Sequence, residues 1–293
     1  MMARARAPLT EILRHLRAEP SRTWSVIITV FGDAIVPRGG SVWLGTLVRF
    51  FAALEIGDGV VRTAVSRLAA DGWLERSRVG RNSFYHLTEK GRATFRQATL
   101  HIYGAHARRW NGRFELILLG DARVRESLRP LLGTAGFGAA APGLWVAPAG
   151  TPVPRVGAGA LHLDAGCDLA TARRLAERCW KLERMAAAYD RFLSLFAPLE
   201  AALDALPIAE GDAFTARILL IHEYRRIILR DPTLPLELLP AAWPGAKARA
   251  LCGELYHRLL PASERWLDDH GLNEAGGLPP AGPELALRFR APA

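Results

Sequence analysis

The chain has 293 residues, of which 50% are hydrophobic and 23% charged, a composition that argues against wholesale disorder and leaves room for two or three domains. Its 38 basic and 29 acidic residues give a net charge of +9, and this whole excess lies in residues 1–112, which hold 17 basic and 8 acidic residues. Such a local excess favours an acidic partner, either nucleic acid or an anionic membrane surface.

Other features of the sequence bear on the compartment. The three cysteines are too few and too scattered for a disulfide framework or a Cys-x-x-Cys metal site. The N-terminus has no apolar stretch followed by a cleavage-like site, so we expect no secretory signal. The most apolar run, residues 24–36, contains Gly32 and Asp33 and falls short of the roughly 20 residues that span a bilayer. We therefore expect a soluble, cytoplasmic protein.

The first predicted domain covers residues 21–104 and follows an N-terminal tail, residues 1–20, that we expect to be flexible. Apolar segments of helical length occupy residues 23–36 and 41–56. A helix from Asp58, two short strands and a closing helix from Thr88 to about Tyr103 are expected after them.

The helix from Asp58 has two different faces. Asp58 is placed to cap it, and its apolar residues recur at helical spacing and predict a buried face: Val61, Ala64, Val65, Leu68 and Ala69. The opposite face presents side chains that are able to bond phosphates or base edges: Arg62, Thr63, Ser66 and Arg67.

A basic hairpin is predicted directly after this helix. Gly72 ends the helix, and residues 73–79 and 83–88 form two strands around the turn Gly80-Arg81-Asn82. Arg76, Arg78 and Arg81 make the hairpin cationic. A helix-turn-helix followed by a basic hairpin is typical of a winged helix, in which the second helix enters the major groove and the wing contacts the backbone. The alternative is an ordinary amphipathic helix and hairpin with solvated arginines.

The second predicted domain covers residues 110–180. The expected elements are a strand over 113–121, a helix from 122 that Pro130 interrupts and that ends near Gly133, two strands at 143–148 and 160–166, and a helix over 168–180. Their order resembles a ferredoxin-like α+β unit in which one strand is missing or unrecognised. A third domain, residues 181–272, is predicted to be helical, and residues 273–293 are predicted to be a flexible tail. The predicted class is therefore α+β.

Three stretches resemble the PaaX family, repressors of phenylacetate catabolism in bacteria. They are RTAVSRLAADGWLERSRVGRNSFYHLTEKG (62–91), WNGRFELILL (110–119) and HEYRRIILRDPTLPLELLPAAWPG (222–245). The resemblance extends from about residue 21 to 270. It implies a winged helix, a ferredoxin-like domain used in dimerisation, a helical C-terminal domain, and release from operator DNA by an aryl-acyl-CoA, typically phenylacetyl-CoA. The DNA-contacting residues would be Arg62, Thr63, Ser66, Arg67, Arg76, Arg78, Arg81 and Asn82.

The effector site is less defined by the sequence. A basic cluster in the C-terminal stretch is a candidate receptor for the phosphates of a CoA ester: His222, Arg225, Arg226 and Arg230. These arginines could instead pair with Glu223, Asp231 or Glu237. The aromatic residues Trp180, Tyr189, Phe192 and Phe196 could line an aryl pocket, although their helical spacing is also typical of a core.

An enzyme is the rival hypothesis, either a CoA-ester hydrolase or a metal-dependent nuclease with the winged helix as a targeting module. His222-Glu223 lacks the second histidine of HExxH, and no phosphate-loop, nucleophile-elbow or dinucleotide motif occurs in a credible context. His222, Cys252 and His257 could converge on a metal, but their spacing is not diagnostic. Asp121 suits a nuclease carboxylate or, more simply, a helix cap. We expect no catalytic residues, no metal and no cofactor.

Overall fold

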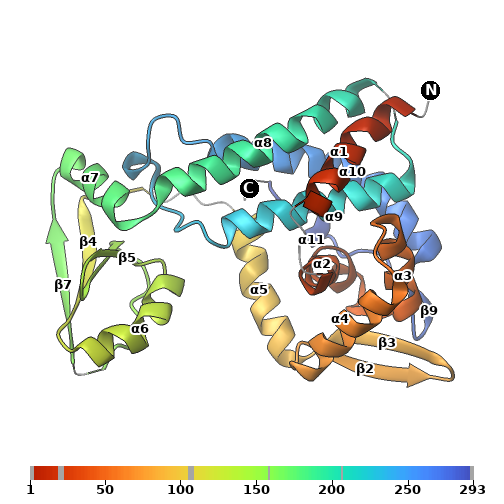
Figure 1. Ribbon diagram of the computed structural model, residues 1–293, viewed down its shortest axis with the longest axis horizontal. Coiled ribbons are helices and arrows are strands. Elements are labelled where there is room, and N and C mark those ends of the chain that lie inside the picture. The colour runs from red at the N-terminus through yellow and green to blue at the C-terminus, as the bar shows by residue number, and fades with distance from the viewer. Residues whose placement is uncertain (1–2, 19–22, 105–108, 158, 206, 291–293) are drawn as a thin grey trace. The chain divides into compact units, whose positions relative to one another are not determined.

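The computed structural model describes residues 3–18, 23–104, 109–157, 159–205 and 207–290 (Figure 1). The chain forms two compact units, both discontinuous in sequence. Unit 1 comprises residues 1–105, 190–229 and 246–293, and unit 2 comprises residues 106–189 and 230–245. Both contain helices and strands, which confirms the mixed α+β class. In the described ranges, no helix is both long and apolar enough to cross a bilayer.

The N-terminal part of unit 1 contains a helical layer and a small sheet. Its elements are α1 (Ala3–Ala18), α2 (Thr23–Val30), a π turn (Phe31–Ile35), a 3₁₀ turn (Val36–Arg38), β1 (Ser41–Trp43), α3 (Leu44–Ala53), α4 (Asp58–Ala70), β2 (Leu74–Val79), β3 (Asn82–Leu87) and α5 (Glu89–Tyr103). The strands pair antiparallel in the order β1-β3-β2. The structure differs from the sequence prediction at residues 3–18, which form a helix rather than a flexible tail.

The turn between α3 and α4 has a strained backbone position. The predicted helix over residues 41–56 is instead a strand, β1, followed by α3, which ends at Ala53. Glu55 has a φ of 57° there, and the amide of Ile56 donates back to the carbonyl of Phe51 at 3.0 Å. This pattern closes the helix with a left-handed residue, a position that glycine usually occupies. The next helix therefore leaves in a new direction, starting from Gly57.

Gly57, rather than Asp58, is the N-cap of α4. Asp58 lies in the first helical turn, where a carboxylate favours the positive end of the helix dipole, and it pairs with Arg62 one turn later. The apolar face is as expected, because Val61, Val65 and Leu68 are all buried.

The remainder of unit 1 is a helical layer with a folded C-terminal segment. It contains α8 (Leu182–Ala205) from residue 190 onward, α9 (Glu210–Ile228), α10 (Gly245–His270), β8 (Leu272–Asn273), β9 (Gly276–Gly277) and α11 (Glu284–Leu287). Helix α9 packs against α1, α2 and α5, and it is buried on every side from Ala213 to His222. The expected C-terminal tail is instead part of the core, since Leu278, Leu285 and Arg288 are buried.

Unit 2 is built on a four-stranded sheet. Its elements are β4 (Arg113–Leu119), α6 (Ala122–Thr134), β5 (Gly138–Ala141), β6 (Leu144–Pro148), β7 (Ala160–Gly166), α7 (Leu169–Cys179) and a 3₁₀ turn (Leu236–Leu238). All neighbours are antiparallel, in the order β5-β6-β4-β7. Strand β5 is the strand that the sequence did not reveal. Helix α6 is not interrupted at Pro130, and it ends at Thr134, near Gly133 as predicted.

Each face of this sheet has its own core. Phe114 and Val146 pack with α7 and with Leu234, Leu238 and Leu239, while Ile117, Leu119 and Ala147 pack with Leu132 and Phe137 on the α6 side. The predicted third domain is therefore not a separate body. Residues 230–245 belong to unit 2, and the helices before and after them belong to unit 1.

Candidate nucleic-acid interface and adjoining cavity

The polar face of α4 is exposed, as the sequence predicted. Arg62, Thr63, Ser66 and Arg67 are all exposed, and they lie on the face opposite the buried Val61 and Val65. Two of the four side chains have internal partners. Arg62 Nε lies 2.7 Å from Asp58 Oδ1, and the Thr63 hydroxyl donates to the carbonyl of Gly59 at 2.8 Å. Arg62 would therefore have to release the Asp58 carboxylate before it could bind an external anion.

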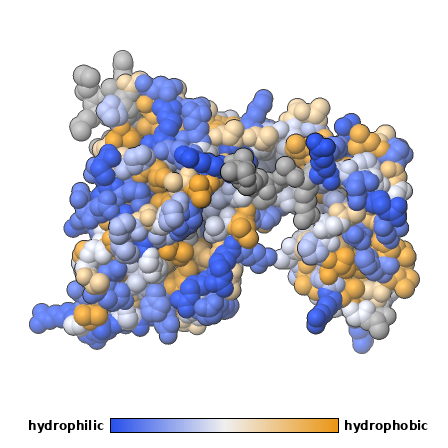
Figure 2. All heavy atoms as spheres, turned by 180° about the vertical axis from the view of Figure 1, so that it is seen from behind, coloured by the Kyte–Doolittle hydropathy of each residue, from blue (hydrophilic) through white to orange (hydrophobic). Residues whose placement is uncertain are grey.

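The hairpin that follows is also exposed and cationic. Its two-residue turn has Gly80 at a φ of 58°, the sign that a tight hairpin turn requires at its first central position. Arg76 donates to Ser83 Oγ at 2.8 Å, and Arg78 donates to the carbonyl of Gly80 at 3.2 Å. Figure 2 shows hydrophilic side chains projecting at the end of unit 1 where Figure 1 places this hairpin.

Four of the predicted contact residues have uncommitted side chains. Among the described residues, Ser66, Arg67, Arg81 and Asn82 take part in no side-chain hydrogen bond or ion pair. Exposed cations without internal partners offer their donors to phosphates and base edges without breaking an existing bond. Arg67 on the helix and Arg81 at the hairpin tip are therefore the residues best prepared for an external contact.

The C-terminal segment of unit 1 is tied to the base of the hairpin sheet. Glu274 accepts hydrogen bonds from Ser41 Oγ on β1 at 2.6 Å and from Ser77 Oγ on β2 at 2.5 Å. Burial alone would raise the pKa of this carboxyl group, but the two serine bonds, together with a backbone hydrogen bond and the nearby His86, outweigh that effect and lower it. Thr46 on α3 adds a bond to the carbonyl of His270 at 2.9 Å.

A buried charge cluster in unit 1 is centred on Asp33, in the π turn that extends α2. Asp33 Oδ2 lies 2.8 Å from Arg217 Nε, and Asp33 Oδ1 lies 2.8 Å from Arg288 Nη1. The Tyr103 hydroxyl donates to Oδ1 at 2.7 Å. Burial alone would lower the pKa of Arg217, but the interactions with Asp33, then Tyr256 and Glu264, outweigh it and raise that pKa. The cluster joins α2, α5, α9 and the C-terminal segment.

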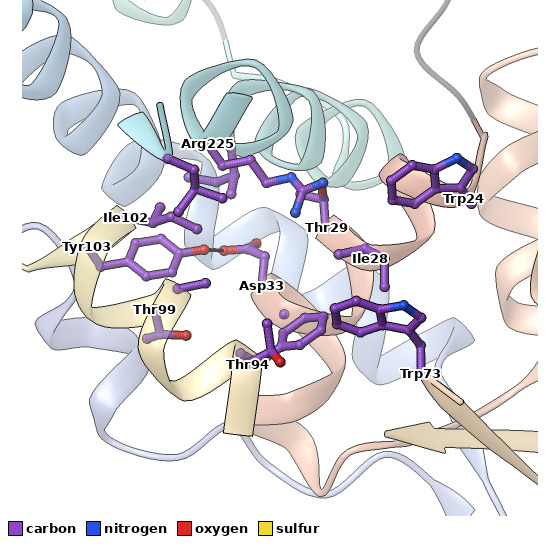
Figure 3. A pocket seen from close by; sticks show the side chains of 15 residues that line it. Trp24, Ile28, Thr29, Asp33, Trp73, Thr94, Thr99, Ile102, Tyr103 and Arg225 are labelled. Atoms are coloured by element: carbon purple, nitrogen blue, oxygen red, sulfur yellow. Dashed lines mark hydrogen bonds between the residues drawn. The ribbon is translucent and has the colours of Figure 1, made fainter. Parts of the chain in front are cut away.

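Helices α2, α5 and α9 border a cavity of about 300 Å³ (Figure 3). Its lining is mainly apolar and aromatic, with Trp24, Ile28, Trp73, Phe95 and Tyr103 among the lining residues. In Figure 3, Trp24 and Trp73 lie at one side, and Tyr103, hydrogen-bonded to Asp33, lies at the other. Trp73 directly precedes β2, so the cavity reaches the base of the hairpin.

Arg225 is the basic side chain that lines this cavity. Its Nη2 donates to the carbonyl of Ser25 at 3.1 Å and to Ser25 Oγ at 2.8 Å. Its Nε is buried and has no hydrogen-bond partner among the described residues. Burial, opposed by Tyr103 and assisted by the charge of Arg226, lowers the pKa of Arg225 to about 10.

The other members of the predicted effector cluster are not gathered around the cavity. His222 is fully buried, its Nδ1 lies 3.0 Å from Thr29 Oγ1, and burial followed by the charges of Arg225 and Arg226 lowers its pKa to about 3. Arg226 Nη1 pairs with Glu223 Oε1 at 3.1 Å. Arg230 is exposed and belongs to unit 2. A single four-residue site is therefore not assembled within unit 1.

The remaining candidates from the sequence have structural surroundings. Asp121 caps α6, accepting the amide of Arg123 at 2.6 Å. Trp180, Tyr189, Phe192 and Phe196 are all buried in cores. Across the described ranges, no three His, Cys, Asp or Glu side chains gather at a metal-binding distance. The sequence had not pointed to Asp33, Arg217 or Arg288. The available signal was a charged residue inside an otherwise apolar helical run, as at Asp33 and Arg217.

An α+β protein that presents an exposed cationic helix next to a cationic hairpin is typical of nucleic-acid-binding proteins. A family described as PaaX-like protein matches residues 22–91, and the PaaX-like protein C-terminal domain matches residues 180–269. The transcriptional repressor PaaX of Escherichia coli (strain K12) is 37% identical over 300 aligned positions, covering 96% of this chain and 94% of that protein. The chain therefore belongs to the PaaX family.

A solved structure is also similar. The uncharacterized protein Rv0674 from Mycobacterium tuberculosis superposes with a TM-score of 0.52 and 27% identity, covering 75% of this chain and 89% of that one. The relative with a stated function is a repressor and not an enzyme. The comparisons therefore do not favour the enzyme hypothesis.

Proposed function

We propose that this chain is a DNA-binding transcriptional repressor of an aromatic-acid catabolic operon, with phenylacetate as the acid, and that an aryl-acyl-CoA such as phenylacetyl-CoA releases it from its operator. The exposed cationic face formed by α4 and the β2–β3 hairpin carries this proposal. It occurs in a chain that is similar to a transcriptional repressor over almost its whole length.

The order of elements supports a winged helix as the DNA-binding part. Helix α3 and helix α4 are joined by the four-residue turn that Glu55 closes, and the β2–β3 hairpin follows directly. In this arrangement α4 enters the major groove, where Ser66 and Arg67 face base edges. Arg76, Arg78, Arg81 and Asn82 then contact phosphates or the minor groove from the wing.

Unit 2 is proposed as the dimerisation part. Its strand order is that of a ferredoxin-like sheet, although α7 follows β7 here instead of preceding it. Strand β7 is an edge of the sheet, and its Leu161 and Leu163 are 61% and 49% exposed. Two chains related by a two-fold axis would read a palindromic operator with half-sites about 34–36 Å apart or a multiple of that distance.

Release by an effector requires differential binding. A ligand with equal affinity for the DNA-competent and DNA-incompetent arrangements shifts neither population, so the acyl-CoA must bind the incompetent arrangement more tightly.

A mobility-shift titration tests the proposal. The full-length protein is titrated onto its own upstream DNA and onto random DNA of equal length, at fixed salt, with phenylacetyl-CoA, with free phenylacetate or with neither. We expect a shift specific to the upstream DNA that is lost only with the CoA ester. Specific binding that neither compound affects would contradict the proposed effector. Equal binding to both DNAs would contradict the proposal that the chain is a sequence-specific repressor.

A further inference from the structure

We propose that the cavity between α2, α5 and α9 is a ligand site that takes one aromatic ring or a similarly compact apolar group, with Arg225 donating to a carbonyl or carboxylate oxygen on it. The ligand's role as a DNA-release signal rests on the proposed function, but its binding is a property of unit 1 that can be measured without DNA.

The size of the cavity limits the ligand. A volume of about 300 Å³ is at the small end of pockets that hold small molecules, which span roughly 300–1,000 Å³. An aromatic acid, or the acyl part of a thioester, is of suitable size, whereas a nucleotide carrier must remain outside. Trp24, Trp73 and Phe95 give the aromatic surface against which a ring packs.

Arg225 supplies the polar part of the site. It is a half-buried cation that pairs with no carboxylate in the described part of the chain, and its buried Nε is left without an acceptor. A buried donor without a partner costs free energy that an incoming oxygen would recover. The one carboxylate that lines the cavity, Asp33, is already paired with Arg217 and Arg288. The cavity therefore has a hydrogen-bond donor without an acceptor, and an acid or an acyl carbonyl would supply that acceptor.

The walls of the cavity connect it to the DNA-binding surface. Helix α2 packs directly on α4, and Trp73 precedes the first strand of the hairpin. A ligand that contacts α9 together with α2 and α5 would shift α4 and the hairpin toward whichever arrangement it binds more tightly.

The first test fills the cavity. Ala98 on α5 lines it, whereas Ala93 on the same helix is exposed and lies outside the lining. Binding of phenylacetate and phenylacetyl-CoA to the full-length protein is measured by calorimetry, with acetyl-CoA as the probe that lacks a ring. We expect wild type and Ala93→Phe to bind at least one ring-bearing probe with equal affinity, and Ala98→Phe to show no binding. Ala98→Leu, a smaller addition, gives the same comparison if thermal unfolding shows that Ala98→Phe is destabilised.

The second test removes the donor. Arg225→Met keeps most of the side-chain length, and Arg226→Met is its matched control outside the lining. We expect Arg225→Met to weaken binding about tenfold or more, the fold-change that a lost charged hydrogen bond of about 1.5–3 kcal/mol produces, and Arg226→Met to leave it unchanged. The probe that binds better tells whether the free acid or the thioester is the source of the ligand.

Unchanged affinity in both Ala98→Phe and Arg225→Met would overturn the inference, as would a wild type that binds neither ring-bearing probe. The proposed function is judged separately, by specific binding of the ligand-free proteins to upstream DNA. If Ala98→Phe binds that DNA and is no longer released from it, both hold. If the cavity binds a probe but no protein binds DNA specifically, the site stands and the repressor proposal fails.

Discussion

At the residue scale, the buried side chain of Asp33 joins several distant segments of the chain. The residue is 1% exposed, and its carboxylate contacts the side chains of Arg217, Arg288 and Tyr103, which come from three separate parts of the chain. Burying such charges carries a large desolvation cost, and an ion pair repays this cost only when its geometry and hydrogen bonds are good. Removing one partner then leaves a charge buried and unpaired.

Replacement of Arg288 tests the importance of this cluster. Arg288→Met keeps the length of the side chain but leaves Asp33 with one cation, so we expect a loss of about 3–5 kcal/mol in the free energy of unfolding. Arg290→Met, two residues away at an exposed position, is the control and should change stability by less than about 0.5 kcal/mol. Denaturant unfolding measures both. Equal stability of the two variants would show that the C-terminal segment does not hold the core.

His222 predicts a pH dependence of stability. Its pKa is lowered from 6.5 to about 3 in the folded chain, so a proton binds the unfolded state more tightly. The stability that follows from keeping His222 neutral is complete above pH 6.5 and is lost as the pH falls from there toward 3. Over this window, wild type should lose up to about 1.4 kcal/mol per pH unit more than His222→Gln.

Urea unfolding at several pH values measures this difference. Parallel slopes for wild type and His222→Gln would mean that the imidazole is not held neutral by burial.

At the scale of elements, we propose different roles in DNA binding for α4 and the hairpin. Arg67 lies on the exposed face of the helix, which we propose enters the groove, so Arg67→Ala should weaken specific binding by roughly 1–3 kcal/mol and random-DNA binding much less. Arg81 lies at the hairpin tip, so Arg81→Ala should weaken binding to all sequences and reduce the salt slope by about one. Titrations on upstream and random DNA at several salt concentrations separate the two effects. An equal loss for Arg67→Ala on both DNAs would contradict its role in base reading.

The elements that the sequence predicted best are those with a strong periodic pattern. The buried face of α4 follows from the spacing of Val61, Val65 and Leu68, and the hairpin follows from Gly80 between two alternating strands. Strand β5 was missed because Gly138-Ala-Ala-Ala has little intrinsic strand propensity, and its structure comes from pairing with β6. The exposed arginines could be predicted because the exposed face of a helix or hairpin follows from the spacing of its own residues. The Asp33 cluster and the cavity could not be predicted in this way, because they join residues about 200 positions apart.

At the scale of the whole molecule, the chain contributes to unit 1, leaves it, and returns twice. Local sequence patterns do not show which distant segments pack together. For this reason the sequence predicted three consecutive domains, whereas the structure has two interleaved units. One consequence is that the C-terminal helices are structural parts of unit 1, the unit that we propose binds DNA. Arg38, shortly before β1, pairs with Glu264 at 2.9 Å and also with Asp268, both on α10. These ion pairs join α10 to the segment that leads into the hairpin sheet.

The most direct test of the central claim compares two variants of equal charge. One carries Arg62→Ala, Arg67→Ala and Arg81→Ala on the proposed DNA-binding face. The other carries Arg123→Ala, Arg129→Ala and Arg178→Ala, all at exposed positions of unit 2. Affinity for upstream DNA is measured for both beside wild type at one salt concentration. The first variant should lose specific binding while the second keeps nearly all of it, and an equal loss in both would mean that net charge, and not this face, binds the DNA.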